Sequence, residues 1–252
     1  MQGFTRVGGL VLVLLVSLVP SSRANFYDVA TDWSDSSNPN GAWTYREGAN
    51  ALPHVDRWEP PLFAWDQPAW ADSQSGGDRI PAWFKAAGTP GGLDFVLGDM
   101  VCHSTDPGSG QGNGPGNIIW TSPELAYGDV SGAVWITRDI GRSVDWAVYY
   151  NGVLVTSGNV SSGDAYDRAS PFDLSMGSGG PSVLDDILFA AGDTLEFRLT
   201  TVTPPPAPWG DLVGVRLAIQ TTAVPEPATM SLLVLGVLSS LLRRRWGRQG
   251  RS

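Results

Sequence analysis

The chain has 252 residues, enough for one domain of about 200 residues and a short targeting segment at each end. Its 31 glycines and 19 prolines, beside plentiful tryptophan and aliphatic residues, exclude a disordered chain and favour short strands joined by turns. The ends hold seven of the 16 basic residues but one of the 25 acidic residues, so the body carries a net charge of about −15, which excludes nucleic acid as a partner.

The N-terminal segment has the three parts of a secretory signal peptide. Arg6 stands before an apolar stretch at residues 8–19, and small residues follow at Ser22 and Ala24. We therefore expect signal peptidase to cut between Ala24 and Asn25 and the body to be exported. The alternative is an uncleaved anchor, but this apolar stretch is short for a hydrocarbon core of about 30 Å. The single cysteine of the chain excludes an internal disulfide, so the prediction of export rests on the ends of the chain.

Residues 25–100 show a weak pattern. Tryptophans recur there with Pro and Gly between them, and the best short strands are predicted at residues 41–45 and 93–98. We expect this half to complete the fold of the second half rather than to form a second domain. The glycine-rich stretch at residues 107–117 is predicted to be an exposed loop.

The second half has the period-two alternation of strands. Strands are predicted at residues 130–136, 194–202 and 212–219, and the first of these is apolar enough to be covered on both sides. Residues 144–155 contain two apolar runs around Asn151-Gly152, which predicts a hairpin. Loops are expected at residues 157–180 and 203–210. The predicted fold class is all-β, an antiparallel β-sandwich.

The stretches WTSPELAYGDVSGAVWI, AAGDTLEFRL and GDLVGVRLAI follow one another with the hairpin between the first two. This order resembles the jelly-roll modules of bacterial surface and polysaccharide-associated proteins, over roughly residues 119–219. The resemblance implies a jelly-roll-like sandwich, and members of that group often bind glycans or calcium. Fold alone confers neither property.

The C-terminal stretch VPEPATMSLLVLGVLSSLLRRRW joins a Pro-Glu-Pro motif, an apolar run and an arginine cluster. The apolar run, residues 228–242, is a marginal transmembrane helix of roughly 22 Å, and the arginines would stay on the cytoplasmic side. The whole resembles the PEP-CTERM sorting signal of Gram-negative bacteria. The resemblance implies recognition by an exosortase, a membrane transpeptidase, and anchoring in the envelope at least for a time. The residues that carry it are Pro225, Glu226, Pro227, Arg243, Arg244 and Arg245.

The alternative for the tail is an ordinary C-terminal membrane anchor. The predicted boundaries divide the chain into four parts. The parts are a signal peptide at 1–24, a β-sandwich domain at 25–222, a sorting segment at 223–246 and a basic tail at 247–252.

Acidic loop residues could bind Ca²⁺, the single metal for which we find a reason in this sequence. Calcium takes six to eight oxygen ligands, and loops rich in Asp and backbone carbonyls supply them. The alternative is that each Asp bonds its own backbone in a turn. The candidates are Asp164, Asp167, Asp193 and Asp211.

Tryptophans outside the clear strands are candidates for sugar binding, because a flat indole stacks on a sugar ring. Trp135 and Trp146 lie within predicted strands and are expected in the core. The alternative for the others is packing in the core or under a loop. The candidates are Trp43, Trp65, Trp70 and Trp209.

We find no motif of nucleophilic, phosphate-binding or zinc chemistry. The sequence therefore favours a non-catalytic, exported surface or matrix protein that binds exopolysaccharide. One alternative is a structural or adhesive spacer without a small ligand, and another is a polysaccharide hydrolase or lyase.

Overall fold

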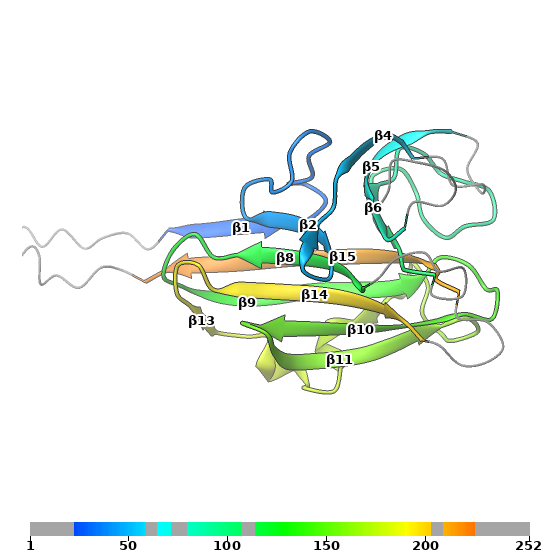
Figure 1. The fold of residues 1–252 in the computed structure, drawn as a ribbon. Helices are drawn as coiled ribbons and strands as arrows, with labels where there is room; N and C mark the ends of the chain where they lie inside the picture. The colour runs from blue at the N-terminus through cyan, green and yellow to red at the C-terminus, as the bar shows by residue number, and fades with distance from the viewer. Residues whose placement is uncertain (1–22, 59–64, 72–79, 107–113, 203–208, 225–252) are drawn as a thin grey trace, which may run out of the picture. The chain divides into compact units, whose positions relative to one another are not determined.

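The computed structural model describes one compact unit, which runs from Arg23 to Val224. The predicted signal peptide lies outside the described residues except for Arg23 and Ala24. The sorting segment lies outside them from Pro225 onward. Two antiparallel sheets make up the unit (Figure 1). The helical elements among its described residues are two short 3₁₀ turns, η2 (Leu174–Met176) and η3 (Pro181–Val183). The described residues are 23–58, 65–71, 80–106, 114–202 and 209–224.

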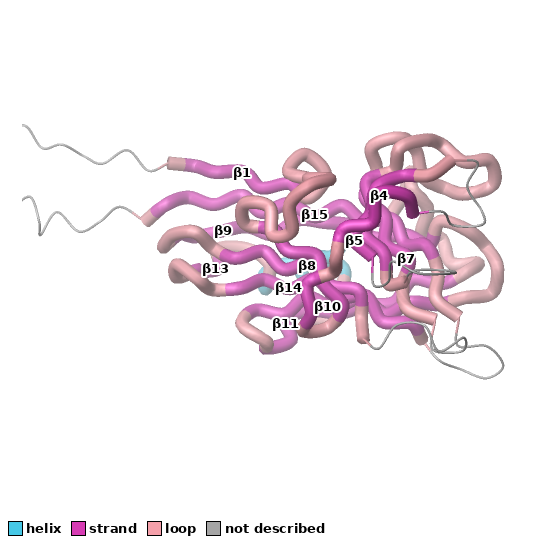
Figure 2. Tube along the Cα trace, turned by 45° about the horizontal axis from the view of Figure 1, so that its top comes forward, coloured by secondary structure: helices cyan, strands magenta, loops and turns pink. Residues whose placement is uncertain are grey.

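The larger sheet has nine strands, and its two longest strands, β9 and β15, pair with each other. The main order is β12-β9-β15-β7-β6-β5-β4, while β13 also pairs with β9 and β1 with β15. Figure 2 shows β1 and β15 side by side. The strands are β1 (Ala24–Asp28), β4 (His54–Trp58), β5 (Gln67–Ala71), β6 (Ala82–Lys85), β7 (Met100–His103), β9 (Ala126–Ile136), β12 (Phe172–Asp173), β13 (Ile187–Phe189) and β15 (Leu212–Ala223).

The smaller sheet has six strands in the order β11-β10-β14-β8-β2-β3. The longer ones lie side by side in Figure 1. Its strands are β2 (Trp43–Glu47), β3 (Asn50–Ala51), β8 (Gly116–Thr121), β10 (Ser143–Tyr150), β11 (Val153–Ser161) and β14 (Thr194–Thr201).

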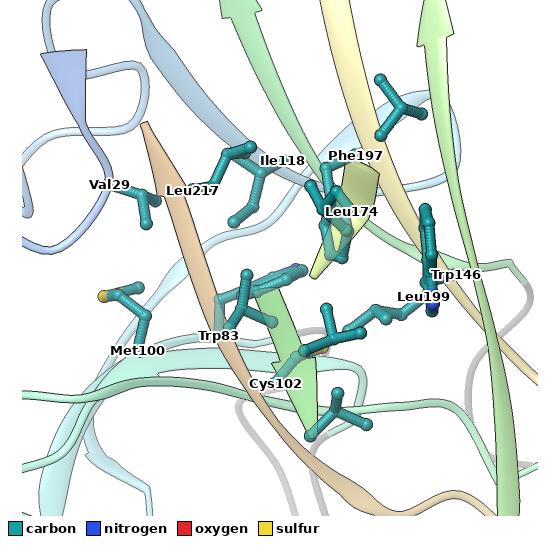
Figure 3. Packing of buried hydrophobic residues seen from close by; sticks show 14 of the residues in the cluster. Val29, Trp83, Met100, Cys102, Ile118, Trp146, Leu174, Phe197, Leu199 and Leu217 are labelled. Carbon is teal, nitrogen blue, oxygen red and sulfur yellow. The ribbon is translucent and has the colours of Figure 1, made fainter. Parts of the chain in front are cut away.

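The main hydrophobic core takes side chains from both sheets (Figure 3). Val134 of β9 and Leu217 of β15 come from the larger sheet, and Trp146 of β10 and Phe197 of β14 come from the smaller one. All four are buried. The two sheets therefore pack face to face, as the alternation in the sequence predicts.

A second core covers the other face of strands β5 to β7. In β6, Trp83 belongs to the main core, whereas its neighbour Phe84 belongs to the second. In β7, Cys102 and Val101 divide in the same way. Successive residues of a strand point to opposite faces, so this part of the larger sheet is buried on both sides.

The predicted hairpin is confirmed. β10 and β11 pair across Asn151-Gly152, and both turn residues have positive φ, 48° and 79°. The predicted strands of the second half are confirmed as β9, β14 and β15, and the strand predicted at residues 41–45 corresponds to β2.

The strand predicted at residues 93–98 is wrong. This segment is a loop in which Phe95 packs into the second core and Gly98 has a φ of 91°. Its backbone is held by single hydrogen bonds rather than by strand pairing. Asp94 N–H donates to the Thr137 carbonyl (2.6 Å), and Trp135 Nε1 donates to the Asp94 carbonyl (2.7 Å). An apolar run that covers another strand has the composition of a strand without its pairing.

Two loop boundaries also differ from prediction. β11 continues to Ser161, so the loop expected at residues 157–180 begins five residues later than predicted. β8 already begins at Gly116, within the stretch expected as the loop 107–117. Residues 107–113 and 203–208 lie outside the described residues. Gly116 is inside a strand because a Cβ atom there would lie 2.9 Å from Cys102 Sγ, so its lack of a side chain serves packing rather than a turn.

Candidate functional site

Two of the four candidate tryptophans are buried, which corrects their predicted exposure. Trp43 is 1% exposed and Trp70 is 4% exposed, both in the main core. Their indole nitrogens have internal acceptors, since Trp43 Nε1 donates to Asp32 (3.0 Å) and Trp70 Nε1 donates to the Ser34 carbonyl (3.0 Å). The Pro and Gly neighbours in the sequence therefore did not mark surface loops: Trp43 begins β2, and Trp70 lies with Pro68 inside β5.

The other two tryptophans keep contact with solvent. Trp209 is 38% exposed. Trp65 is half-buried, and a Cβ atom at Gly88 would lie 2.7 Å from its ring, so one part of the indole rests on the Gly88 backbone. Trp135 and Trp146 are fully buried, as the sequence predicts. Sugar stacking by Trp209 or Trp65 stays a prediction.

The four candidate calcium ligands do not come together. Asp193 accepts from Tyr150 Oη (2.6 Å), whereas Asp211 pairs with Arg138. Asp164 accepts from two backbone N–H groups of its own turn, and Asp167 accepts from one. No group of three or more His, Cys, Asp or Glu side chains in the described part of the chain is placed to hold a metal ion. Local turn roles, which were the alternative, account for the contacts of Asp164 and Asp167. Asp193 and Asp211 instead contact side chains that are far away in the sequence.

The described body contains a solvent-open hollow of about 440 Å³. Three segments meet there: residues 92–94, the end of β9 with residues 137–139, and the end of β11 with residues 162–167. We call it the β9–β11 cavity. The side chains that could meet a ligand are Asp94, Thr137, Arg138, Asp139, Ser162, Asp164, Tyr166 and Asp167.

Most of the charge in this cavity is negative. Asp139 is exposed and forms no hydrogen bond or ion pair with any other described residue, and Asp94 accepts from Arg168 N–H (2.6 Å) through one oxygen. The single guanidinium, Arg138, is turned toward Asp211. The cavity therefore presents free carboxylate oxygens, which accept hydrogen bonds and attract cations.

A buried hydroxyl and a phenol complete the lining. Thr137 is 1% exposed, and its Oγ1 has no hydrogen-bond partner among the described residues. A buried polar atom without a partner costs about 1–3 kcal/mol. Tyr166 is half-buried and packs on Phe172 with 4.6 Å between ring centroids. The cavity thus combines hydroxyl, carboxylate and aromatic groups.

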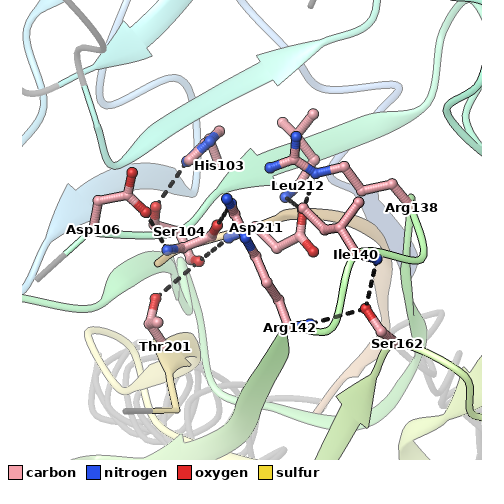
Figure 4. Close-up of polar contacts among 11 residues, drawn as sticks. His103, Ser104, Asp106, Arg138, Ile140, Arg142, Ser162, Thr201, Asp211 and Leu212 are labelled. Carbon is pink, nitrogen blue, oxygen red and sulfur yellow. Dashed lines mark hydrogen bonds and ion pairs between the residues drawn. The ribbon is translucent and has the colours of Figure 1, made fainter. Parts of the chain in front are cut away.

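A buried polar network lies beneath the cavity and supports Arg138 (Figure 4). Asp211 is fully buried and accepts from Arg138 Nε and from Leu212 N–H (2.8 Å). Its own N–H donates to Ser104 Oγ (2.9 Å), and Arg142 donates to the Gly210 carbonyl. The network holds the end of β9 against the start of β15, so the cavity wall is rigidly placed.

Burial shifts the pKa values of this network. Desolvation raises the pKa of Asp211 above its usual value, and the Arg138 guanidinium opposes that shift. Desolvation lowers the pKa of His103 to about 4; a contact with the Ser104 carbonyl opposes the shift, and Arg138 and Arg142 add to it. His103 is therefore neutral at pH 7.

A second cavity, of about 320 Å³, lies beside β1. Phe26, Tyr27, Asp32 and Asn40 line it together with the edge of Trp43. Asp32 is largely committed inside the protein, since it accepts from Asp28 N–H and from Trp43 Nε1, each at 3.0 Å. This cavity is more aromatic and offers fewer free polar atoms than the β9–β11 cavity.

Both ends of the body leave from neighbouring strand ends. Ala24, the residue expected before the signal-peptidase cut, pairs with Thr222 of β15. Ala223 N–H donates to the Arg23 carbonyl and Val224 N–H donates to the Leu125 carbonyl, both at 3.0 Å. No helix in the described ranges has the length and apolar character to cross a membrane, and the apolar run at 228–242 lies outside them.

These features define an all-β protein body of two antiparallel sheets that is followed directly by a separate C-terminal signal. Residues 223–245 match the family described as the PEP-CTERM protein-sorting motif, which confirms the resemblance seen in the sequence. The chain therefore carries a PEP-CTERM sorting motif. The motif implies export, sorting to the cell envelope or surface, and processing by an exosortase.

The body itself has weak likeness to known structures. It is similar to the catalytic domain of a GH87 alpha-1,3-glucanase in complex with nigerose, at 14% identity and a TM-score of 0.26. The match covers 75% of this chain and 29% of that chain. A likeness at this level defines neither a shared fold nor a shared activity. A comparison with curated proteins finds no significant match.

Sequence reasoning found part of the β9–β11 cavity and missed the rest. Asp164 and Asp167 were candidates as calcium ligands. Asp94, Asp139 and Tyr166 were not among the candidate residues. Asp94 lies 70 residues before Asp164 in the chain, and the fold alone brings them together. An available signal was the pair of Asp-containing turns that directly follow the predicted strand at 130–136 and the hairpin.

Proposed function

We propose that this exported protein is non-catalytic and that its body binds neutral or amino-sugar units of an extracellular polysaccharide in the β9–β11 cavity. The finer fold class, a jelly-roll-like sandwich, and display in the matrix of a Gram-negative host belong to the same proposal. The observation that carries it is the lining of the cavity, where free carboxylate oxygens, hydroxyls and the Tyr166 phenol share one open hollow.

The size and chemistry of the cavity support a sugar as the ligand. Its volume of about 440 Å³ falls in the usual range of about 300–1,000 Å³ for small-molecule sites. Sugars present many hydroxyl donors, which carboxylates such as Asp139 accept, and a ring face that Tyr166 can contact.

The charge of the cavity narrows the class of sugar. Asp94, Asp139, Asp164 and Asp167 face one guanidinium that Asp211 already occupies. A uronic acid would bring a further negative charge into this field, whereas a neutral sugar would not and an amino sugar would be attracted. Trp209, exposed outside the cavity, is the further candidate for stacking a sugar ring.

Affinity electrophoresis of the full chain tests the proposal. We expect dextran or chitosan to retard the protein and alginate not to. Asp139→Asn should weaken binding about tenfold, because a hydrogen bond to a charged group is lost. Asp185→Asn is the matched control, since Asp185 is also an exposed carboxylate without a described partner and its loss changes the net charge equally.

Each of three results would contradict the proposal and favour another explanation. Equal weakening by both variants would mean nonspecific charge attraction. Retardation by none of the polysaccharides, together with a cell-aggregation defect on deletion, would favour a structural or adhesive spacer. Release of reducing ends from a polysaccharide by the purified protein would establish a hydrolase or lyase.

A further inference from the structure

Exposed apolar side chains gather around the point where the chain leaves the body for the sorting motif. Ten large hydrophobic side chains are exposed in the described residues, and four of them lie here. Phe26 is 64% exposed, while Leu125, Tyr127 and Leu188 are 47–49% exposed. We call these four residues the exit patch. Clustering of exposed apolar side chains is typical of an interaction site.

The strand register places the exit patch on one face of the larger sheet. Leu188 of β13 lies opposite Tyr127 of β9, and Tyr127 lies opposite Thr222 of β15. Phe26 of β1 lies opposite Gln220, two residues before Thr222. Residues opposite in register, or two apart along a strand, point to the same side of a sheet. The patch therefore lies at the end of the larger sheet where the chain leaves the folded body.

The linear motif begins immediately after this patch. Val224, whose N–H is bonded to the Leu125 carbonyl, directly precedes Pro225. The family match itself starts at Ala223, inside β15. No spacer separates Pro-Glu-Pro from the folded body, and residue 228, where the apolar run begins, is at most about 14 Å of extended chain from Val224. An enzyme that binds Pro225–Pro227 must therefore meet the body surface beside Leu125.

The charges around the exit patch favour a protein over a lipid surface as the partner. Glu124 lies next to Leu125, and Asp185 and Asp186 lie next to β13. Asp129, two residues after Tyr127 in β9 and on the same face, accepts from Asp186 N–H (2.9 Å). These carboxylates would be repelled by anionic lipid headgroups, whereas a protein can place donors against them.

We propose that the exit patch is a docking surface for the exosortase that processes the tail, so that recognition includes the folded body as well as the linear motif. The proposal goes beyond the sorting motif and does not depend on sugar binding. It explains why apolar side chains stay exposed on β1 and on the strands β9 and β13 beside β15.

The test is the rate of tail processing in the host, followed by pulse–chase and by the mass of the C-terminus. We expect Tyr127→Ser and Leu188→Ser, combined, to slow processing about tenfold, as loss of apolar anchors at an interface does. Leu97→Ser and Val153→Ser are matched controls, because both residues are 68% exposed and neither belongs to the exit patch. Equal melting temperatures of the two double variants show that folding is not the cause.

A spacer variant separates body docking from access to the motif. Six Gly-Ser residues inserted between Val224 and Pro225 move the motif away from the exit patch. We expect this insertion to slow processing, and the patch variant to add little on top of it. Patch variants processed at the wild-type rate, or a spacer that speeds processing, would overturn the proposal.

Two other occupants give distinct outcomes that also overturn it. A lipid surface would show as patch-dependent flotation of the protein with phosphatidylethanolamine–phosphatidylglycerol vesicles, with unchanged processing. A second copy of the chain would show as patch-dependent dimers in sedimentation, again with unchanged processing.

Discussion

Strands β6 and β14 bury their side chains in different ways, although each lies inside a sheet. In β6 the neighbours Trp83 and Phe84 are both buried, one in the main core and one in the second core. In β14 Phe197 is buried, whereas its neighbour Arg198 stays half-exposed and stacks over Tyr149. A strand with one wet face shows alternation in its sequence, and a strand with two covered faces does not.

This difference explains where the sequence was informative. β14 and β15 alternate cleanly, and they were predicted. β5 to β7 are apolar on both faces and short, so their signal was a scatter of tryptophans rather than a period. The second core also needs a cover, and the loop with Phe95 supplies part of it, which is why that loop was mistaken for a strand.

The largest expected effects compare neighbouring residues in the two strands. Trp83→Ala and Phe84→Ala should each lower the free energy of unfolding by about 3–5 kcal/mol, because each leaves a cavity in a packed core. In β14 the same change should cost about as much at Phe197 and less than about 1 kcal/mol at Arg198. Urea unfolding of the four variants measures this.

A small effect of Phe84→Ala would contradict the second core. The slope of the unfolding transition with urea provides the control, since an unchanged slope means that the same surface unfolds in every variant.

The part of the larger sheet that is buried on both faces should also make the free energy of unfolding depend on pH. His103 ends β7, and its pKa of about 4 lies below the ordinary 6.5, so the unfolded chain binds a proton more readily between these values. The free energy of unfolding should therefore fall as the pH drops from 6.5 toward 4, by at most about 3 kcal/mol. Asp211, whose pKa is raised, acts in the opposite direction near the acid end of this range.

His103→Gln removes the titration while keeping a neutral polar side chain. Its unfolding free energy, measured by urea at pH 6.5 and pH 5, should change less with pH than that of the wild type. His54→Gln serves as the control for the other histidine. A wild-type protein equally stable at both pH values would contradict the assigned shift.

Tryptophan–glycine pairs sharpen the comparison because they occur in both sheets. Trp146 lies opposite Gly158 in the smaller sheet, and Trp135 lies opposite Gly214 in the larger one. A Cβ atom at Gly158 would lie 2.6 Å from the Trp146 ring, and one at Gly214 would lie 2.1 Å from the Trp135 ring. Each indole therefore lies on a bare backbone.

Gly158→Ala and Gly214→Ala should each destabilise the protein by about 1–3 kcal/mol through overpacking. Gly91→Ala is the control, because a Cβ atom there would have open space and its φ is not positive. Melting temperatures compare the three. Equal effects at all positions would mean a loss of glycine flexibility rather than a clash with tryptophan.

The smallest expected effect concerns the hairpin turn. Asn151 Oδ1 accepts from Thr194 N–H (2.9 Å), and its Nδ2 donates to Asp193 (3.0 Å), so the turn is tied to the start of β14. Asn151→Gly keeps the positive φ but loses these contacts, and should cost about 1 kcal/mol in urea unfolding. A cost of several kcal/mol would mean that the turn, not the packing of β10, determines the stability of the hairpin.

The candidate site was less predictable than the fold, for a related reason. Asn151-Gly152 predicts a hairpin because the requirement is local. The β9–β11 cavity joins Asp94 to Asp139 and Tyr166 across the fold, and no local rule pairs these residues. Exposure of a tryptophan is equally non-local: Trp43 and Trp209 have similar neighbours in the sequence, yet one is buried and the other is not.

The most direct test of the central claim, that the body binds sugar in the β9–β11 cavity, is an NMR titration of the ¹⁵N-labelled protein with a neutral oligosaccharide. We predict shifts that saturate at amides around Asp94, Asp139 and Tyr166, with none around Val153 on the far hairpin turn. Saturating shifts elsewhere, or no shifts with neutral and amino-sugar oligosaccharides alike, would contradict the account.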